Sequence, residues 1–288
     1  MLARQRQAYI LERVREDGGV RVSDLVRELG VSDMTIRRDL EFLHGRGLVE
    51  KVHGGAAAIP GSALFEPSFA AKSALQRAEK QAIAEAAVAL VDPGSAIGIS
   101  AGTTTHAIAR RLVDVIGLTV VTNSVPVADA LYEAGRPDQT IILTGGVRTP
   151  SNALVGPFAV SALRSVHLDL AFMGVHGMDL HAGFTSPNLL EAETDRALIE
   201  AGRRRVVVAD HTKWGVIGLS SIARLDQADV LISDAGLSPA ARETLSSHIR
   251  EVIVVEPRQS AESRRSAVTE EQETAGVLSP DGRLAAGG

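Results

Sequence analysis

The chain has 288 residues, of which 45% are hydrophobic, so it is long enough for two domains of ordinary size with a real core. It contains no cysteine, which excludes disulfides and thiolate metal sites and fits a reducing cytoplasm. The net charge of the chain is −5. Residues 1–57 hold 10 Lys and Arg against 9 Asp and Glu, so the acidic excess belongs to the rest of the chain. Any contact of residues 1–57 with nucleic acid must therefore depend on where the individual basic residues lie.

The first residues are charged throughout and lack the apolar segment of a signal peptide. No run approaches the roughly 18 apolar residues that a membrane helix needs. These two features predict a cytoplasmic protein without a membrane partner.

Residues 1–57 carry the pattern of compact helices followed by a hairpin. A first helix ends near Gly18-Gly19, and a second is predicted to begin at the N-cap Ser23 and to stop at Gly30. Their apolar residues recur at helical spacing and are expected to face inward: Ile10, Leu11, Val14, Leu25, Val26 and Leu29.

A third helix is predicted in VSDMTIRRDLEFLHGRG, with Ser32 as its N-cap and Gly45 and Gly47 at its end. The strand or hairpin LVEKVHGG follows it. Two helices joined by a tight glycine turn form a helix-turn-helix, and a β-wing after it makes it winged. Helix spacing alone leaves open an ordinary three-helix domain with a charged outer face. The inward face would carry Ile36, Leu40 and Leu43, and the outward face and its flanks Met34, Thr35, Arg37, Arg38 and Glu41.

The rest of the chain divides into three parts. Residues 58–75 are rich in Pro, Gly, Ser and Ala and are predicted to be a linker, and residues 257–288 lose apolar periodicity and are predicted to be a disordered tail. Between them, in 76–256, short apolar runs alternate with amphipathic helical stretches, which indicates an open, mostly parallel α/β sheet. The predicted strands are AIGI (96–99), LTVVT (118–122), TIIL (140–143), LAFM (170–173), RVVVA (205–209), VLI (230–232) and VIVV (252–255).

Small, hydrogen-bonding residues follow four of these strands, and ligands of open α/β sheets bind beyond the carboxyl ends of strands. The loop SAGTTTHAIA (100–109) also opens a helix, whose free amides favour phosphate. Each loop alone reads as a turn with a cap, but together they favour a pocket for a small polar ligand. The candidates are Ser100, Gly102, Thr103, Thr104, Thr105, Asn123, Ser124, Thr144, Gly145, Gly146, Gly174 and His176, with Lys213 as a counter-charge for an anion.

Motifs for other chemistry do not occur in the sequence. The eight histidines have no metal-ligand spacing, and neither a G-x-S-x-G elbow nor a G-x-G-x-x-G or P-loop motif is present. We therefore expect no metal and no cofactor.

The sequence resembles the DeoR family of bacterial transcription regulators along roughly residues 5–255. One departure is Ser100, where the family commonly has Asp. The match in the first domain comprises Leu25, Leu29, Val31, Ser32, Thr35, Ile36, Arg37, Arg38, Asp39, Leu40, Leu43, Gly47 and His53-Gly54-Gly55-Ala56. It continues through Glu79-Lys80, Ile83-Ala84, Gly102-Thr103-Thr104-Thr105, Thr122-Asn123-Ser124, Thr144-Gly145-Gly146, Gly183-Phe184-Thr185 and Asp210-His211-Thr212-Lys213.

The resemblance implies a winged helix-turn-helix at 1–57 and a sensor and oligomerisation domain of the ribose-5-phosphate isomerase-like fold at 76–256. Family members usually respond to a sugar phosphate or related metabolite, and most repress sugar-utilisation genes. The expected partners are double-stranded operator DNA, a small-molecule effector and further copies of the chain, as a dimer or tetramer. Ser32, Met34, Thr35, Arg37 and Arg38 would lie at the major groove, and Arg46, Lys51 and His53 would contact phosphates.

The alternative is an enzyme, because sugar-phosphate isomerases share the implied sensor fold. Those enzymes need positioned carboxylates for proton transfer, and the corresponding positions here are Met173 and His176. Glu191 and Glu193 remain, but without partner groups they read as helix-face residues. We therefore expect a regulator that has kept the pocket without the chemistry.

Overall fold

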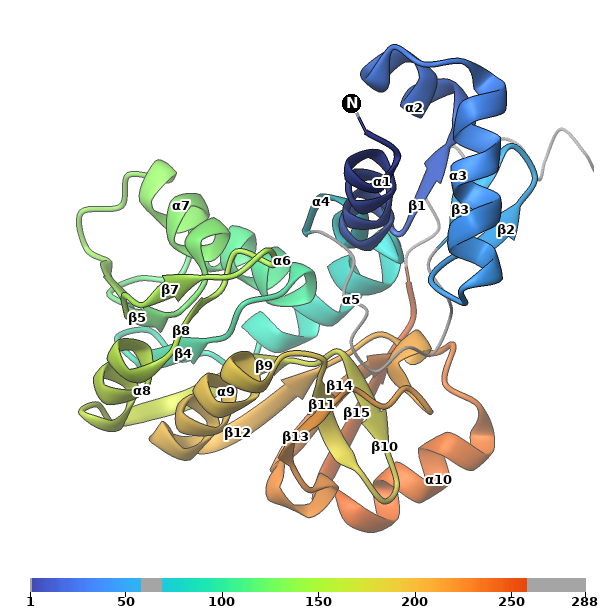
Figure 1. The fold of residues 1–288 in the computed structure, drawn as a ribbon. Coiled ribbons are helices and arrows are strands. Elements are labelled where there is room, and N and C mark those ends of the chain that lie inside the picture. Colours follow the sequence, from blue (N-terminus) through green and yellow to red (C-terminus); the bar gives the residue numbers. More distant parts are fainter. Residues whose placement is uncertain (1, 58–68, 258–288) are drawn as a thin grey trace, which may run out of the picture.

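A computed structural model describes residues 2–57 and 69–257 (Figure 1). Most of the predicted linker, 58–68, and all but the first residue of the predicted tail, 258–288, lie outside the described residues. None of the helices in the described part is long and apolar enough to cross a membrane.

The first domain, here called the head, packs three helices against a small antiparallel sheet of order β1-β3-β2 (Figure 1). Its core is built from the predicted inward faces, and Ile10, Leu25 and Ile36 are at most 1% exposed. Burying a side chain of this size stabilises the fold by ~1.5–3 kcal/mol. The elements are α1 (Ala3–Asp17), β1 (Gly19–Arg21), α2 (Val22–Leu29), α3 (Asp33–Gly45), β2 (Glu50–Val52) and β3 (Gly55–Ala57).

The predicted N-cap Ser23 is wrong, because α2 already begins at Val22 after Arg21, whose side chain makes no cap bond. The reason is the strand before it. β1 pairs with β3 and leads straight into the helix, and the amide of Val22 donates to the carbonyl of Gly54 at 2.9 Å. Pairing with the wing therefore sets the start of the helix, and the capping preference of serine does not.

Helical structure also begins earlier than expected after the gap. Residues 69–74, at the end of the predicted linker, form α4 (Phe69–Ala74). Gln76, in a left-handed conformation with φ 48°, then turns the chain into α5 (Arg77–Val88). The Ala- and Ser-rich composition that suggested a linker is equally compatible with this short helix. Contacts with α5 and with α6 (Thr103–Leu112), farther along the chain, hold the helix in place.

The second domain is built on a parallel sheet of seven strands in the order β15-β14-β12-β9-β4-β5-β6. All seven predicted strands are present, and the expectation of an open parallel α/β sheet is confirmed. The strands are β4 (Ala96–Ile99), β5 (Thr119–Thr122), β6 (Thr140–Leu143), β9 (Leu168–Gly174), β12 (Gly202–Val208), β14 (Val230–Asp234) and β15 (Glu251–Val255).

Helices cover both faces of this sheet (Figure 1). On β9, Phe172 joins the cluster under α5, α6 and α7, whereas its neighbour Met173 joins the cluster under α9 and α10. This alternation is the period of two that a strand buried on both faces requires. The helices are α6 (Thr103–Leu112), α7 (Val125–Glu133), α8 (Pro157–Arg164), α9 (Leu189–Ala201) and α10 (Pro239–His248), with the 3-10 turns η1 (His211–Lys213) and η2 (Leu225–Gln227).

Two smaller sheets complete the domain, and the sequence patterns did not predict them. An antiparallel sheet has the order β10-β11-β13, and a hairpin pairs β7 with β8. Their strands are two to four residues long, too short for a period-two pattern to stand out. They are β7 (Val147–Arg148), β8 (Leu154–Val155), β10 (Gly177–Asp179), β11 (Gly183–Ser186) and β13 (Ser220–Ala223).

Candidate functional sites

The amino end of α3 is organised by two of the predicted DNA-contacting residues. The Oγ of Ser32 accepts from the amide of Thr35 at 3.3 Å, and the two hydroxyls lie 2.9 Å apart. The predicted N-cap is confirmed. Both hydroxyls therefore fix the start of this helix as well as lying on its outward side.

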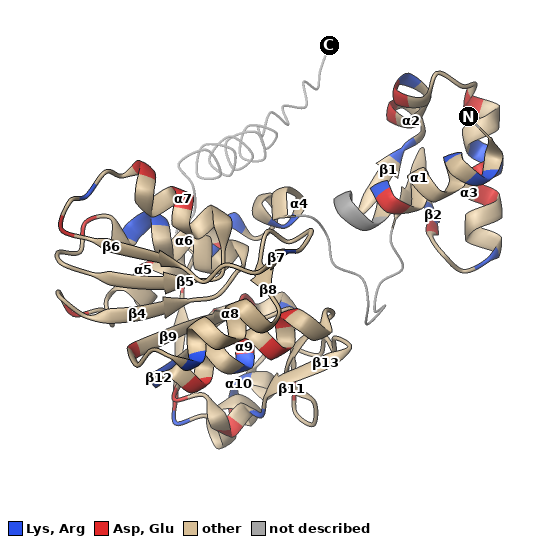
Figure 2. Ribbon diagram, turned by 60° about the vertical axis from the view of Figure 1, so that its left-hand side comes forward, with Lys and Arg blue, Asp and Glu red and all other residues tan. Residues whose placement is uncertain are grey.

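The outer face of α3 presents an exposed side-chain set of mixed charge. Met34 is 60% exposed, and Arg37 pairs with Asp33 at 2.5 Å, which raises the pKa of the arginine. Arg38 is also exposed and makes no hydrogen bond or ion pair with any residue in the described part of the chain. Figure 2 shows acidic and basic residues interspersed along this helix, so Arg38 is the cation best placed for a new partner.

The orientation of α3 is set from its buried side by an ion pair with α1. Nε of Arg6 lies 2.5 Å from Oδ2 of Asp39, which is 4% exposed, and Nε2 of Gln7 donates to Oδ1 at 2.8 Å. Removing one partner of such a pair leaves a buried charge and costs about 3–5 kcal/mol. Asp39 therefore faces away from any DNA, although it follows two arginines in the sequence.

The three residues that we predicted at phosphates lie at the end of α3, where Arg46 is the C-cap, and on the wing, which carries Lys51 and His53. Lys51 pairs with Glu41 of α3 at 3.1 Å, and the guanidinium of Arg46 lies 4.6 Å from the ring centre of Phe42. His53 is exposed at the turn between β2 and β3. All three are accessible, but Lys51 would exchange an acidic partner for a phosphate on binding DNA.

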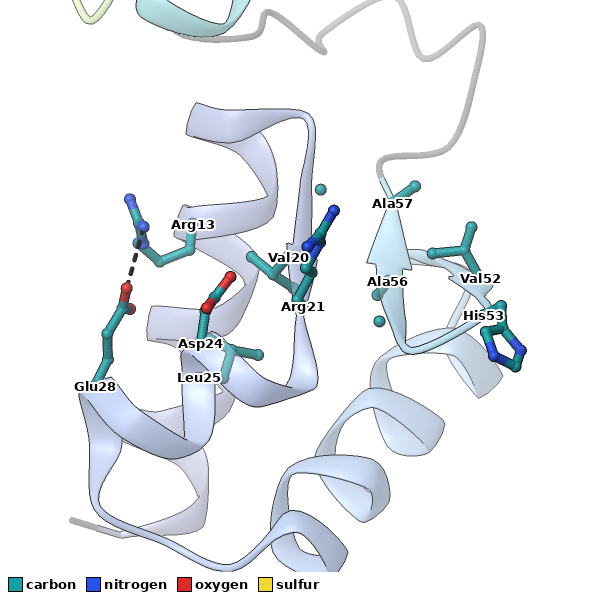
Figure 3. A pocket seen from close by; sticks show the side chains of 12 residues that line it. Arg13, Val20, Arg21, Asp24, Leu25, Glu28, Val52, His53, Ala56 and Ala57 are labelled. Carbon is teal, nitrogen blue, oxygen red and sulfur yellow. Dashed lines mark hydrogen bonds and ion pairs between the residues drawn. The ribbon is translucent and has the colours of Figure 1, made fainter.

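A hollow opens in the head behind the wing, between α1, α2 and the small sheet (Figure 3). Its rim carries an ion pair of 3.4 Å between Arg13 and Glu28, and Val52 and His53 lie at its other side. Its floor is largely backbone and small side chains of β1 and β3. This arrangement brings no set of catalytic groups together.

The second domain contains a cavity of about 300 Å³ beyond the carboxyl ends of β4, β9 and β12. Its walls come from α4 and α5, from the start of α6, and from the loops after β9, β11 and β12. It is lined by Lys72, Leu75, Gln76, Lys80, Ala101, Gly102, Thr103, Thr104, Gly174, Val175, His176, Ser186, Pro187, Glu191, Asp195, Asp210, Thr212, Lys213 and Ile222.

The amino end of α6 opens into this cavity. Gly102, Thr103 and Thr104 line it, and the first amides of a helix have no partner within the helix. The hydroxyl of Thr105 instead donates to the carbonyl of Gly102 at 3.0 Å and is fully buried. This end of the helix favours a negative charge through its amides and dipole.

The expectation that four loops line one pocket holds for two of them. Gly174 and His176, after β9, line the cavity with the loop after β4. The loops after β5 and β6 do not, because β6 is the edge strand and β5 lies between it and β4, so both are farther from β9 and β12 than β4 is. The predicted residues outside the cavity wall are Ser100, Thr105, Asn123, Ser124, Thr144, Gly145 and Gly146.

Two of these residues brace the cavity from behind. The Oγ of Ser100 accepts from the amide of Gly174 at 2.9 Å, which ties two cavity loops together. The Oδ1 of Asn123 accepts from the amide of Ala101 at 3.0 Å. Ser100 is fully buried, so the presence of Ser in place of the expected Asp affects how the loops after β4 and β9 pack together.

The remaining residues have local structural roles. Ser124 caps α7 by accepting from the amide of Val127, and Thr144 bonds the carbonyl of Gly145 at 3.2 Å. Gly146 lies against the backbone of β8, where a Cβ would come within 2.5 Å of the carbonyl oxygen of Val155. Sequence position at a strand end indicated the correct edge of the sheet, but the strand order decides which loops reach the cavity.

Several charged residues of the cavity were not predicted from the sequence. Lys80 of α5 is 6% exposed, and burial lowers its pKa to about 8. Lys72 lines the same side, and Lys213, which was predicted, lies on η1. The motif Glu79-Lys80 in the matched pattern was the available signal for the buried lysine.

Carboxylates also line the cavity. Glu191, at the start of α9, accepts from the Oγ of Ser151 at 2.5 Å, and Asp195 lies one turn later. Asp210 is 1% exposed and accepts from the amide of Thr212 at 3.1 Å. A cavity lined by cations, helix amides and carboxylates suits a ligand with an anionic group and several hydroxyls.

The positions tested for isomerase chemistry differ in their surroundings. Met173 is fully buried in the core beneath α9, and His176 lines the cavity. Among the described residues, no three His, Asp or Glu side chains are grouped to hold a metal ion.

Comparison with known proteins identifies both domains. Residues 6–60 match the DeoR-like helix-turn-helix domain, and residues 75–235 match the DeoR C terminal sensor domain. The crystal structure of ribose 5 phosphate isomerase A from Neisseria gonorrhoeae is a distant match, with 16% identity over 48% of this chain and 53% of that chain and a TM-score of 0.35.

Relatives match along nearly their whole length. The HTH-type transcriptional regulator YgbI of Escherichia coli is 40% identical, with 85% of this chain and 95% of that protein covered. The HTH-type transcriptional regulator GlpR of Haloferax volcanii is 37% identical (86% and 96% covered), and the glycerol-3-phosphate regulon repressor of Escherichia coli is 32% identical (85% and 96%). These names support a regulator over the isomerase alternative, and the chain belongs to the DeoR family of DNA-binding transcription regulators.

Proposed function

We propose that this regulator represses carbohydrate-utilisation genes and is controlled by a sugar phosphate or related metabolite bound in the cavity of the second domain. The observation that carries the proposal is the cavity itself, which is lined by the amino end of α6, by Lys80 and Lys213, and by Glu191 and Asp195. A phosphate would accept charge-assisted hydrogen bonds from the amides and ammonium groups, and sugar hydroxyls would donate to the carboxylates. The name of the glycerol-3-phosphate regulon repressor agrees with this class of effector.

At the DNA, we propose that the outward face of α3 lies in the major groove. Met34, Thr35, Arg37 and Arg38 would approach base edges there, with Ser32 near the groove wall. Arg46, Lys51 and His53 would contact phosphates from the wing side. The protein would act in the cytoplasm on double-stranded operator DNA.

The effector proposal is tested by operator binding in the presence of sugars. Fluorescence anisotropy of a labelled operator would be measured with a panel of sugar phosphates and the matching free sugars. We expect at least one phosphate ester to change the affinity and its free sugar to have a much smaller effect. Equal effects of the two would contradict the anion site.

A substitution at the start of α6 sharpens this test. Thr104→Glu places a carboxylate where the phosphate would lie, so the response to sugar phosphates should be lost while operator binding without effector remains. Thr104→Val is the matched control, because it keeps the shape of the residue and adds no charge. A Glu variant that still responds fully would place the effector elsewhere.

We also propose that the protein binds DNA as a homo-oligomer, a dimer or tetramer. One recognition helix reads only a few base pairs, and two heads of a dimer read half-sites about one helical turn, 10–10.5 base pairs, apart. Sedimentation of the full chain should show a dimer or larger. Insertion of five base pairs between the half-sites should strongly reduce binding, and a monomer that binds both operators equally would contradict this proposal.

A further inference from the structure

Lys80 connects the cavity to α4, the first described element after the head. Its Nζ donates to the carbonyl oxygens of Lys72 and Leu75, both at 2.6 Å. These carbonyls lie at the carboxyl end of α4, where helix carbonyls have no partner within the helix. The buried ammonium of α5 therefore holds the end of the preceding helix.

α4 depends on such contacts for its position. It has only six residues and none of them is buried, and an isolated helix of that length is not stable in water. Phe69 of α4 also meets His106 of α6 edge-on, with ring centres 5.4 Å apart. The hydrogen bonds of Lys80 therefore help to keep α4 against the second domain.

The same ammonium also faces the ligand cavity. Lys72, Leu75, Gln76 and Lys80 form one part of its wall, and Thr104 and its neighbours at the start of α6 form another. An ammonium has three protons, and two of them are used by the carbonyls of Lys72 and Leu75. No hydrogen bond of the third proton is seen among the described residues, and the carboxylate of Asp210 lies near enough to favour the charged form.

We propose that Lys80 is a positioning residue that couples ligand binding in the cavity to the docking of α4. An anion that accepts the third proton would stabilise the ammonium in its buried place, and with it the two bonds that hold α4. Because residues 58–68 join the head to α4, the position of α4 fixes the point from which the head is tethered. This inference rests on the proposed function only in taking the effector to be anionic.

Hydrogen exchange of the full-length protein, followed by mass spectrometry with and without inorganic phosphate, tests the coupling. In the wild type, phosphate should slow exchange in the segment 69–76. Lys80→Met should raise exchange there at least about tenfold without phosphate, because two charge-assisted bonds are lost, and phosphate should no longer slow it. Lys80→Arg keeps donors at this place and should recover part of the protection.

Lys213→Met is the matched control, because it removes one positive charge from another wall of the same cavity. It should weaken phosphate binding, and without phosphate it should raise exchange in 69–76 far less than Lys80→Met does. Equal loosening of α4 by both Met variants would overturn the role of Lys80. So would a wild type in which phosphate protects Thr103 and Thr104 but leaves 69–76 unchanged, and this second comparison needs no variant to fold.

The result separates the coupling from the proposed function. In one outcome, sugar phosphates fail to alter operator binding, but Lys80→Met still raises hydrogen exchange in 69–76 and phosphate still slows it in the wild type. The effector proposal then fails and the coupling stands. If sugar phosphates control operator binding and α4 does not respond to phosphate or to Lys80→Met, the coupling fails and the effector proposal stands.

Discussion

At the scale of single residues, Arg38 is the arginine of α3 that we expect to contact DNA most directly. Arg37 is engaged with Asp33, whereas Arg38 is exposed and has no hydrogen-bond or ion-pair partner among the described residues. If it contacts a base edge, Arg38→Ala should cost about 1–3 kcal/mol of specific binding and relax one operator position. A gel-shift series with substituted operators measures both effects, and an unchanged base preference would remove this role.

Lys51 should behave differently because its expected partner is a phosphate. Lys51→Ala should weaken binding to all sequences alike and reduce the slope of log affinity against log salt by about one. In the free protein Nζ of Lys51 lies 3.1 Å from Oε1 of Glu41, and this ion pair must break before Lys51 can contact a phosphate. The salt dependence of that ion pair must therefore be considered when the slope is interpreted. A loss confined to one operator sequence would argue against a phosphate contact.

The pKa of Lys80 leads to a pH prediction. Burial lowers it to about 8, so the folded protein releases this proton at a lower pH than the unfolded chain does, and the cost of burying the charge disappears as pH rises above about 8. An anion prefers the ammonium, so phosphate affinity should fall as pH rises through about 8. The other charges near it are Asp210, Lys213, Lys72 and Glu79.

Calorimetric titration with inorganic phosphate at pH 7.5, 8.5 and 9.5 measures this dependence. We expect a loss of about tenfold across the range for the wild type, since the neutral amine attracts the anion far less. Lys80→Arg stays charged and should show a much smaller change. The same pH dependence in both proteins would assign the titration to another group.

At the scale of elements, the buried pair of Arg6 and Asp39 decides how α3 is presented. Asp39→Ala should destabilise the packing of α1 on α3 by about 3–5 kcal/mol, because Arg6 keeps a buried charge without its partner. Hydrogen exchange of the full chain should then rise in α1 and α3 and stay unchanged in the parallel sheet. Asp24→Ala is the control, since its pair with Arg27 is exposed and contributes at most about 1 kcal/mol.

The elements also show how far the sequence leads. Each strand of the parallel sheet can be predicted from a short apolar run, because a strand buried on both faces needs apolar residues throughout. The buried face of α3 can likewise be predicted from the spacing of Ile36, Leu40 and Leu43. The start of α2 depends on the pairing of β1 with β3, a contact between residues more than thirty positions apart, and α4 is held by side-chain bonds from Lys80 of the next helix. Local propensity cannot contain such information.

The candidate site has the same division. Gly102, Thr103 and Thr104 were found because a glycine followed by hydroxyls opens a helix after a strand. The loops with Asn123 and Gly146 have the same local signature but end up behind or beside the cavity, since the strand order places them there. Lys80 and Glu191 reach the cavity from helices, where a charged residue in sequence looks like any solvated one.

At the scale of the whole molecule, effector and operator are linked through one protein and must affect each other equally. If a sugar phosphate changes operator affinity by some factor, typically about 5–150, saturating operator must change the affinity for that sugar phosphate by the same factor. Anisotropy of labelled operator with and without the sugar phosphate gives the first factor. Calorimetric titration of the sugar phosphate with and without unlabelled operator, at the same salt concentration, gives the second.

Unequal factors would mean that the binding followed by calorimetry occurs at a site other than the one that controls operator affinity, and so would contradict control through a single cavity. The effector must also persist through the measurement unchanged. We expect no turnover of pentose or hexose phosphates by the pure protein, because Met173 lies in the core and His176 stands where the second proton-transfer carboxylate would be needed. The residues of the cavity then only bind the ligand. Under the proposed coupling, the free energy of binding can shift the equilibrium of α4 toward its docked position, and with it the position of the head.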